Sequence, residues 1–372
     1  MKDLKRIEPE VLQDLVEGRA IEELSTKHLL SYYENDNKNN RYSAAVKSTV
    51  DPRSNEAIIY NPSRVDRPHD YHIKEESPTL FRNDCPICNG KTTGILDLVE
   101  LSDEFTFINK NLYPVLSPPE LQDDNKTPQN FPVWGMHLVQ WSSSYHERDW
   151  HNMPIEDCVV VMSRLAAAEK KLLQVGEEIS KDMIAMGSSS GDQCYVSIIK
   201  NVGSAVGGSL EHGHQQIILG NLAPRRILNN QRFLNKQGKT FSEYSQLTNP
   251  SEFLIRDYGS AVLLVSEFMR RPYEMILVLK DFRKSYLHEL DSAEVLAISK
   301  GWKDATRLFQ ELMPELKREL AYNVVTHNGP GAGLYFEFLP FTQEQGGLEH
   351  LGLAICQAEP EQVANKIRAK LV

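Results

Sequence analysis

Several features that define other classes of protein are missing from this chain of 372 residues. No apolar run approaches the roughly 20 residues that a membrane-spanning helix needs, so we expect no membrane partner. The N-terminal residues Met1–Arg6 lack the apolar segment of a signal peptide, and we therefore expect a cytoplasmic location. An excess of basic residues is also missing. The net charge of −10 argues against a protein that binds nucleic acid by bulk electrostatics.

Cysteine is scarce as well, and its five positions do not resemble a disulfide framework. Two cysteines form Cys85-Pro86-Ile87-Cys88, whereas Cys158, Cys194 and Cys356 are scattered in apolar runs. This usage indicates a reducing compartment with a metal-binding or a redox pair. A redox dithiol normally lies where a strand leads into a helix, but this pair lies in a turn, which favours zinc. Because no second Cys-x-x-Cys exists, histidines must supply the other ligands.

The remaining composition is typical of a globular protein, with 41% hydrophobic and 25% charged residues. The predicted order of strand, long helix, strand, turn and strand occurs twice, at about 133–220 and about 273–340, which indicates a weak internal duplication. We therefore predict an N-terminal extension (1–42), a unit that carries the candidate site (43–220) and a second, degenerate unit (221–372). The first long helix is predicted to begin at Pro154 and to end by Gly176. Residues 221–250 are predicted to form polar loops.

One stretch between two strand-like runs carries most of the candidate chemistry. It reads Asn201-x-Gly203-x-Ala205-x-Gly207-Gly208-Ser209-x-x-His212-Gly213-His214-Gln215-Gln216. Residues two apart in an extended chain point to the same face, so His212, His214 and Gln216 would form a row. Two imidazoles and an amide donor at one place suit transfer through a covalent histidine intermediate, and the glycines let backbone amides approach a phosphate. A His-x-His pair alone is more often a polar pair or a metal clamp, so the neighbouring motifs matter.

Together with that stretch, several motifs match, in order, those of the galactose-1-phosphate uridylyltransferase family, a transferase branch of the histidine-triad superfamily. The further motifs are Pro62-x-Arg64-x-x-Arg67-Pro68, Cys85-Pro86-x-Cys88, Asn111-Leu112-Tyr113-Pro114, Ser144-Tyr145-His146, Gly346-Gly347-Leu348-Glu349 and Pro360-Glu361-x-x-Ala364. The resemblance covers most of residues 50–370. Gln216 stands where nucleotide hydrolases of the superfamily carry a third histidine, which favours the transferase branch. The resemblance implies an α+β fold of duplicated histidine-triad-like α/β units, with helices packed on an antiparallel sheet.

The resemblance also implies a role for each matched residue, in a reaction of carbohydrate metabolism. His214 would attack a nucleoside diphosphate sugar, take its nucleoside monophosphate (expected to be UMP) and pass it to a sugar 1-phosphate, while Gln216 would hydrogen-bond the transferring phosphoryl group. Substrate would be bound by Arg64, Arg67, Asn111, Asn201, Gly207, Gly208, Ser209 and Glu349. Structural zinc would be bound by Cys85, Cys88, His146 and His212. The family also implies a homodimer.

Other interpretations remain open at this stage. Inorganic phosphate could be the acceptor, which would make the protein a phosphorylase of nucleoside diphosphate sugars or dinucleoside polyphosphates. The protein could also be an inactive zinc-stabilised nucleotide binder, because Glu211 and Gly213 replace prolines of the family. In addition, Gly333-Leu334-Tyr335 replaces the His-Trp-His pair of the family's second metal site, and we expect no metal there. Iron could replace zinc, and the third zinc ligand could instead be one of His69, His72 and His151. His137 is interpreted as a structural residue.

Overall fold

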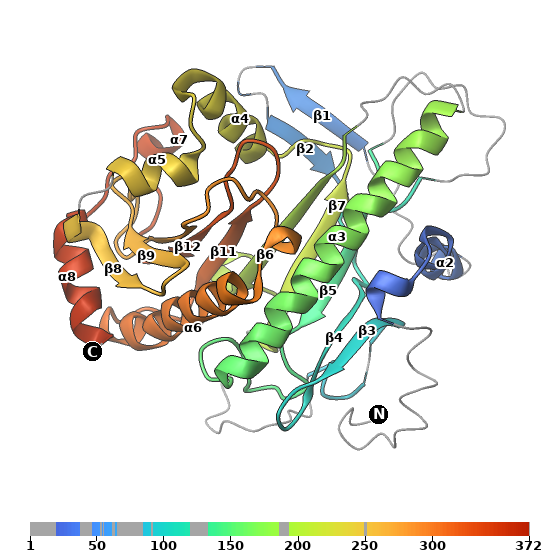
Figure 1. Ribbon diagram of the computed structural model, residues 1–372, viewed down its shortest axis with the longest axis horizontal. Coiled ribbons are helices and arrows are strands. Elements are labelled where there is room, and N and C mark those ends of the chain that lie inside the picture. The colour runs from blue at the N-terminus through green and yellow to red at the C-terminus, as the bar shows by residue number, and fades with distance from the viewer. Residues whose placement is uncertain are drawn as a thin grey trace.

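The chain forms one large antiparallel sheet with helices packed against it, as the computed structural model in Figure 1 shows. The structure describes residues 20–37, 47–52, 54, 56–61, 64, 85–90, 92–119, 133–185, 193–248 and 251–371. Within these residues the sheet has ten strands. In spatial order they are β3 (Ile95–Glu100), β4 (Phe105–Lys110), β5 (Gly135–Trp141), β7 (His214–Gly220), β6 (Tyr195–Val202), β11 (Tyr322–His327), β12 (Tyr335–Pro340), β10 (Met275–Leu279), β9 (Ala261–Val265) and β8 (Leu254–Asp257). The predicted α+β fold is therefore confirmed.

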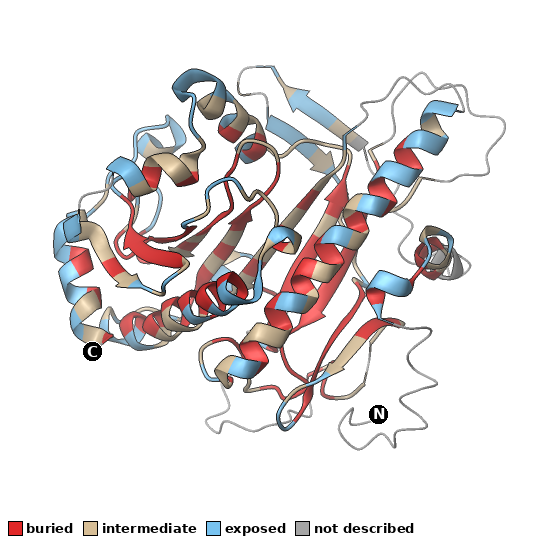
Figure 2. Ribbon diagram, in the orientation of Figure 1, coloured by how far each residue is buried: buried red, intermediate tan, exposed pale blue. Residues whose placement is uncertain are grey.

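Two long helices, α3 (Ile155–Ala185) and α6 (Ser292–Glu315), cross one face of this sheet. Buried and exposed stretches alternate along both helices in Figure 2, and their buried residues form the main hydrophobic core together with residues of the strands. The start of α6 has the capping box predicted by its sequence, because the Glu294 amide donates to Asp291 (2.9 Å) and the Asp291 amide donates to Glu294 (2.8 Å). Trp302 and Phe309 are fully buried core residues of α6, also as predicted.

Helix α3 continues beyond the predicted end at Gly176. A Cβ atom at Gly176 would lie 2.8 Å from Cβ of Cys194, which precedes β6. The glycine therefore permits a close approach between helix and sheet and does not mark a helix end. The sequence pattern alone cannot separate these two uses of glycine.

Residues 221–250 were also predicted wrongly, because they contain two helices and not only loops. Helix α4 (Arg225–Gln237) follows Pro224 and ends before Gly238, whose φ of 68° is left-handed. Helix α5 (Phe241–Thr248) follows directly. Each helix has few apolar residues, but Phe233 of α4 contacts Phe241 of α5 with ring centroids 5.7 Å apart. This tertiary contact compensates for the weak apolar pattern.

The described part of the N-terminal extension packs against the first half of the sheet. It consists of the short helix η2 (Ile21–Glu23) and helix α2 (Thr26–Asn37). Arg164 of α3 joins the extension to the sheet, since its guanidinium donates to Glu22 of η2 and to Asp97 of β3, each at 2.8 Å. The Tyr33 hydroxyl accepts a hydrogen bond from the backbone amide of His137 on β5 (3.0 Å). This segment therefore supports the strand next to β7.

The remaining elements lie at the margins of these layers. A two-stranded ribbon is formed by β1 (Lys47–Asp51) and β2 (Glu56–Tyr60). The other short elements are η4 (Ser204–Val206), η5 (Ser251–Phe253), η6 (Leu287–Glu289), α7 (Gly347–His350) and α8 (Pro360–Lys370). None of the helices in the described ranges is both long and apolar enough to cross a membrane.

The strand register places one row of side chains across both halves of the sheet. Ile199 of β6 lies opposite Gln216 of β7 and opposite Val325 of β11, and Val325 lies opposite Glu337 of β12. Directly opposed residues in a sheet share a face, so Gln216 and Glu337 point the same way. The neighbouring residue Ile217 belongs to the core beneath α3, so this row lies on the face that α3 and α6 leave open. The division of the chain at residue 220 stays a prediction.

Candidate functional site

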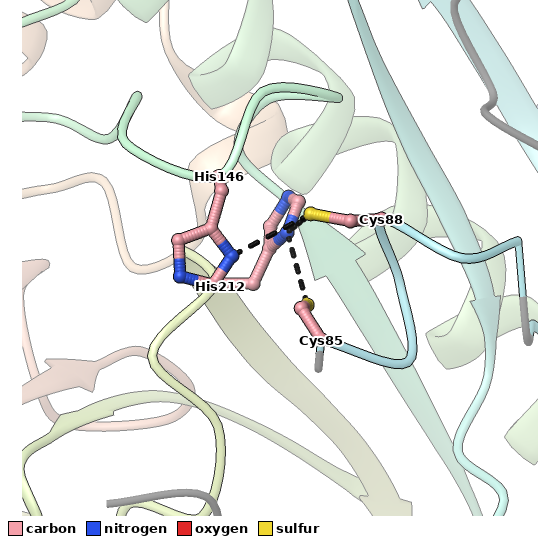
Figure 3. A group of neighbouring side chains, drawn as sticks. All are labelled: Cys85, Cys88, His146 and His212. Atoms are coloured by element: carbon pink, nitrogen blue, oxygen red, sulfur yellow. Dashed lines mark hydrogen bonds between the residues drawn. The ribbon is translucent and has the colours of Figure 1, made fainter. Parts of the chain in front are cut away.

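Four buried side chains, Cys85, Cys88, His146 and His212, form a cluster at one edge of the site (Figure 3). Their candidate ligand atoms all lie within 4.8 Å of one another. Nδ1 of His212 is 3.7 Å from Sγ of Cys85 and 3.6 Å from Sγ of Cys88, and Nδ1 of His146 is 3.6 Å from Sγ of Cys88. The turn before β3, the loop after β5 and the loop before β7 thus meet at a cluster that could hold a metal ion.

The hydrogen-bond partners of the cluster suit metal binding. Nε2–H of His212 donates to the Ser143 carbonyl (2.8 Å), and this bond leaves the lone pair of Nδ1 directed at the two sulfurs. Nε2 of His146 lies 3.9 Å from the carboxylate of Glu211. The hydrogen bond from Cys85, with His146 and His212 nearby, lowers the pKa of the Cys88 thiol. Burial disfavours the imidazolium of His146, but hydrogen bonds to Cys88 and Glu211 outweigh burial and raise the pKa of His146 to about 9, so a metal ion that binds here would displace its proton.

His214 begins β7, and its side chain is buried beside the cluster. Its Nδ1 lies 2.8 Å from the backbone carbonyl of His212. A carbonyl can only accept a hydrogen bond, so Nδ1 carries the proton and Nε2 keeps its lone pair. Burial lowers the pKa of His214 to about 4, with Lys200 also disfavouring the imidazolium. The imidazole is therefore neutral near pH 7, as a nucleophile must be.

Gln216 lies two residues after His214 on the same face of β7, and His137 of β5 fixes its amide. The amide N–H of Val115 donates to Nδ1 of His137 (3.0 Å), so Nε2 of His137 carries the ring proton. Nε2–H then donates to Oε1 of Gln216 (3.1 Å). This bond directs the NH2 group of Gln216 away from His137. Both ring nitrogens of the buried His137 thus have partners, as expected of a structural residue, and its bond to Gln216 is a contact that the sequence did not reveal.

Asn111, a predicted substrate-binding residue, lies next to this pair, and Arg64 contacts the turn that follows it. Oδ1 of Asn111 accepts from the Tyr113 amide (2.8 Å), and Nδ2 of Asn111 is 3.1 Å from Nε2 of His137. The guanidinium of Arg64 donates to the Tyr113 carbonyl. The structure therefore brings Asn111 and Gln216 to His137, and Arg64 to the turn that follows Asn111. Arg67, His69 and His72 lie outside the described residues.

The Gly-rich bend before His212 is held by its own hydrogen bonds. The amides of Gly207 and Gly208 donate to the carbonyls of Ser204 (3.2 Å) and Gly203 (3.0 Å). Gly207 has a φ of 83°, a conformation that favours glycine. Ser209 is buried. The predicted contacts of these residues with phosphate stay predictions, as does that of Asn201, whose Oδ1 accepts from Asn323 of β11 (2.8 Å).

Glu349, a predicted substrate-binding residue, lies in a different part of the structure from His214 and Gln216. It caps its own short helix α7, where its carboxylate accepts from the Gly346 amide (2.8 Å), and it lines a hollow with Arg270 and Arg271. Its proposed contact with substrate stays a prediction. His146, and not His151, belongs to the cluster that could hold a metal ion.

A buried ion pair that the sequence analysis missed supports the loop of His212 and His214. Nζ of Lys200 is 2.7 Å from the Asp149 carboxylate and donates to the His214 carbonyl (3.2 Å). A Cβ atom at Gly213 would lie 2.6 Å from Cγ of Asp149. The absence of a side chain at Gly213 therefore makes room for Asp149. No local pattern in the sequence predicts this arrangement, because Asp149, Lys200 and Gly213 lie on three separate segments.

Comparisons with known proteins agree with this architecture. No protein-family model matches the chain. ADP-glucose phosphorylase of Arabidopsis thaliana is 23% identical over 346 residues, which are 86% of this chain and 91% of that protein. A solved uridylyltransferase structure has a TM-score of 0.65 and 21% identity, covering 87% of this chain and 98% of that one.

A crystal structure of ADP-glucose phosphorylase from Arabidopsis thaliana with bound ADP-glucose superposes with a TM-score of 0.60 and 20% identity. The match covers 87% of this chain and 99% of that one. The relatives named here are enzymes. In its motifs, its sequence similarity and its fold, the chain resembles the galactose-1-phosphate uridylyltransferase family, as predicted from the sequence.

Proposed function

We propose that the protein is a nucleotidyltransferase that acts on nucleoside diphosphate sugars through a nucleotidyl-histidine intermediate at His214. The observation that carries this proposal is the hydrogen bond from Nδ1–H of His214 to the His212 carbonyl. It leaves an unprotonated Nε2 in a neutral imidazole, on the sheet face where Gln216 presents its amide. Nucleophile and hydrogen-bond donor are thereby oriented before substrate binds.

In the first half-reaction the lone pair of Nε2 forms a bond to the α-phosphorus. The bond from that phosphorus to the oxygen bridging the α- and β-phosphates breaks, and the sugar 1-phosphate leaves with the electron pair. The NH2 group of Gln216 would donate to an oxygen of the phosphoryl group in transit, where negative charge accumulates. Arg64 would hold the phosphates, and the turn at Asn111 would contact the nucleoside.

In the second half-reaction an oxygen of a phosphorylated acceptor attacks the phosphorus and the P–N bond breaks, which restores neutral His214. With a sugar 1-phosphate as acceptor, the product is a new nucleoside diphosphate sugar, and UMP would be the transferred group. Inorganic phosphate is the second candidate acceptor, and it would yield a nucleoside diphosphate. The similarity to an ADP-glucose phosphorylase supports this second candidate.

We further propose that Cys85, Cys88, His146 and His212 bind one structural zinc ion. With Zn–S near 2.3 Å and Zn–N near 2.05 Å, a tetrahedral site separates sulfur from nitrogen by about 3.6 Å. The observed separations of 3.6 to 3.7 Å fit this geometry. Because four protein ligands close the coordination shell, the metal would tie the Cys85–Cys88 turn to the catalytic loop. It would not activate water.

Intact-protein mass spectrometry tests the proposal. The full chain is incubated briefly with UDP-glucose, UDP-galactose, ADP-glucose or GDP-mannose. We expect a mass gain of one nucleoside monophosphate with at least one donor, absent in His214→Ala and retained in His350→Ala, a matched change at an exposed histidine. An adduct that persists in His214→Ala, or no adduct with any donor, would contradict the proposed intermediate.

The acceptor is identified by a chase of the labelled protein. Inorganic phosphate should release a nucleoside diphosphate if the protein is a phosphorylase. A hexose 1-phosphate should release a nucleoside diphosphate sugar if it is a transferase between sugars. Chromatography of the released nucleotide separates the two outcomes.

A further inference from the structure

The second half of the sheet has a cavity of its own. It has a volume of about 530 Å³, within the usual range of about 300–1,000 Å³ for small-molecule sites. Helices α4 and α5, strands β10 and β12, and the loop between β9 and β10 supply its walls. The lining residues that matter here are Arg226, Arg270, Phe233, Phe241, Tyr335 and Glu337.

The position of the cavity mirrors that of the first site. Glu337 occupies the same transverse row of the sheet as Gln216, on the same face, with β6 and β11 in between. Three interstrand spacings of about 4.8 Å put the two strands roughly 14 Å apart. The cavity is therefore the counterpart of the first site in the second half, with different side chains.

The charges at the cavity favour an anion. Glu337 is paired with His327 (2.8 Å) and lies 3.7 Å from Arg226. Glu274 is likewise satisfied, since it pairs with Arg271 (3.1 Å) and accepts from the backbone amide of Arg270 (2.8 Å). The lining thus carries three arginines and two glutamates, and the glutamates are paired with Arg226, Arg271 and His327. The guanidinium of the exposed Arg270 makes no ion pair within the described part of the chain.

The rest of the lining offers aromatic faces and an unused donor. The ring of Phe241 lies 5.1 Å from that of Tyr335 and 5.7 Å from that of Phe233, measured between centroids. The Tyr335 hydroxyl donates to Oδ1 of Asn230 (3.2 Å). Nδ2 of Asn230, a buried amide in the cavity wall, has no hydrogen-bond partner among the described residues. Arginines beside aromatic rings suit a phosphoryl group attached to a ring.

We propose that this cavity is a second ligand site, which binds a small phosphorylated molecule with a ring, such as a nucleoside monophosphate or a sugar phosphate. The phosphoryl group would accept hydrogen bonds from Arg226 and Arg270, and the ring would pack against Phe241 and Tyr335. This site is separate from nucleotidyl transfer at His214 and does not depend on it.

Isothermal titration calorimetry of the full chain tests the second site with AMP, UMP, glucose 1-phosphate and inorganic phosphate as probes. The test variant is Arg226→Gln/Arg270→Gln, and the matched control is Arg232→Gln, an exposed position of the same helix outside the cavity. For at least one organic phosphate, the double variant should lose one bound ligand per chain or bind at least about tenfold more weakly. Arg232→Gln should match the wild-type protein. If the double variant does not fold, Arg270→Gln alone takes its place.

Identical stoichiometry and affinity in the double variant and in Arg232→Gln, for all four probes, would overturn the second site. Absence of binding by every probe would overturn it too. Equal affinity for inorganic phosphate and for the organic phosphates would refute the contact between ring and aromatic wall. The His214-dependent adduct is measured in the same variants, and it should persist in the double variant. Failure of the adduct alone would concern only the transfer reaction.

Discussion

The contact between His137 and Gln216 leads to a test of how the site is organised. Replacing His137 by leucine leaves a side chain of similar size in the strand but removes the N–H group that donates to Oε1 of Gln216 (3.1 Å). The Gln216 amide can then rotate, and its NH2 group no longer points to one place. We expect slower formation of the nucleotidyl-histidine, with His214 itself unchanged.

The size of the effect follows from the buried position of the contact. His137 is fully buried and Gln216 is nearly so. A buried polar group that loses its partner costs about 1–3 kcal/mol. If the transition state requires the oriented amide, that cost appears in the barrier, and each 1.36 kcal/mol is about tenfold in rate. The labelling rate should therefore fall roughly 10- to 100-fold.

The assay is the single-turnover rate of adduct formation, measured by rapid quench and mass spectrometry. A double-mutant cycle with Gln216→Ala separates positioning from general damage, because His137→Leu should have little further effect once Gln216 is absent. His137→Gln, which keeps an N–H donor, should recover part of the rate. Tyr33→Phe is the structural control, since it removes the hydroxyl that bonds the His137 backbone but leaves the imidazole in place.

Equal rate losses from His137→Leu in the wild-type and the Gln216→Ala backgrounds would refute the positioning role. So would a loss in Tyr33→Phe as large as that in His137→Leu, because the backbone and not the imidazole would then be decisive. Thermal unfolding of each variant shows whether the altered protein is still folded.

Three further changes test other parts of the structure. Cys88→Ser should bind less than the one metal ion per chain expected of the wild-type protein, as measured by plasma mass spectrometry. A chelator should lower the melting temperature of the wild-type protein but not that of Cys88→Ser. A full metal content in the variant would contradict the zinc site. Burial disfavours the charged form of Glu337, but its ion pairs outweigh burial and lower its pKa from 4.5 to about 2. The pairs should therefore stabilise the folded protein by on the order of 3 kcal/mol above pH 4.5, and this stabilisation should be lost as the pH falls to 2. Urea unfolding at several pH values should show a shallower acid loss in Glu337→Gln, and an unchanged slope would argue against the pair. Gly213→Ala should destabilise the protein by about 1–3 kcal/mol, because the new Cβ would lie 2.6 Å from Asp149. Gly347→Ala is the control and should be neutral, because its Cβ would enter open space. Equal melting temperatures of the two variants would contradict the clash.

Features of the fold with local or periodic signals could be predicted from the sequence. The capping box at Asp291 and the helical spacing of Trp302 and Phe309 are examples, since each depends on neighbours a few residues away. The order of strands and helices follows from the same kind of signal, whereas the α+β class was implied by the resemblance of the motifs to a known family. The motif predicted a row of His212, His214 and Gln216; the structure places His214 and Gln216 on one face of β7, whereas His212 lies in the bend before the strand.

Features that depend on contacts between distant segments could not be predicted. Gly176 resembles a helix end until Cys194 is seen packed against it, and α4 and α5 have too few apolar residues to stand out. The role of His137 depends on Val115 and Gln216, which lie in two other segments. Buried hydrogen bonds of this kind have no sequence period, so only the folded chain reveals them.

The same reasoning applies to the missing prolines around His214, which in the sequence supported an inactive nucleotide binder. A proline would stiffen the loop that carries His212 and His214, but here other contacts hold it. The His214 side chain bonds the His212 carbonyl, Lys200 bonds the His214 carbonyl, and Asp149 fills the space that Gly213 leaves. Since Lys200 and Asp149 form a buried pair, loosening the loop would expose or separate two charges, which is costly. A loop held by such a pair does not need proline for rigidity. The absence of proline is therefore no argument for lost turnover.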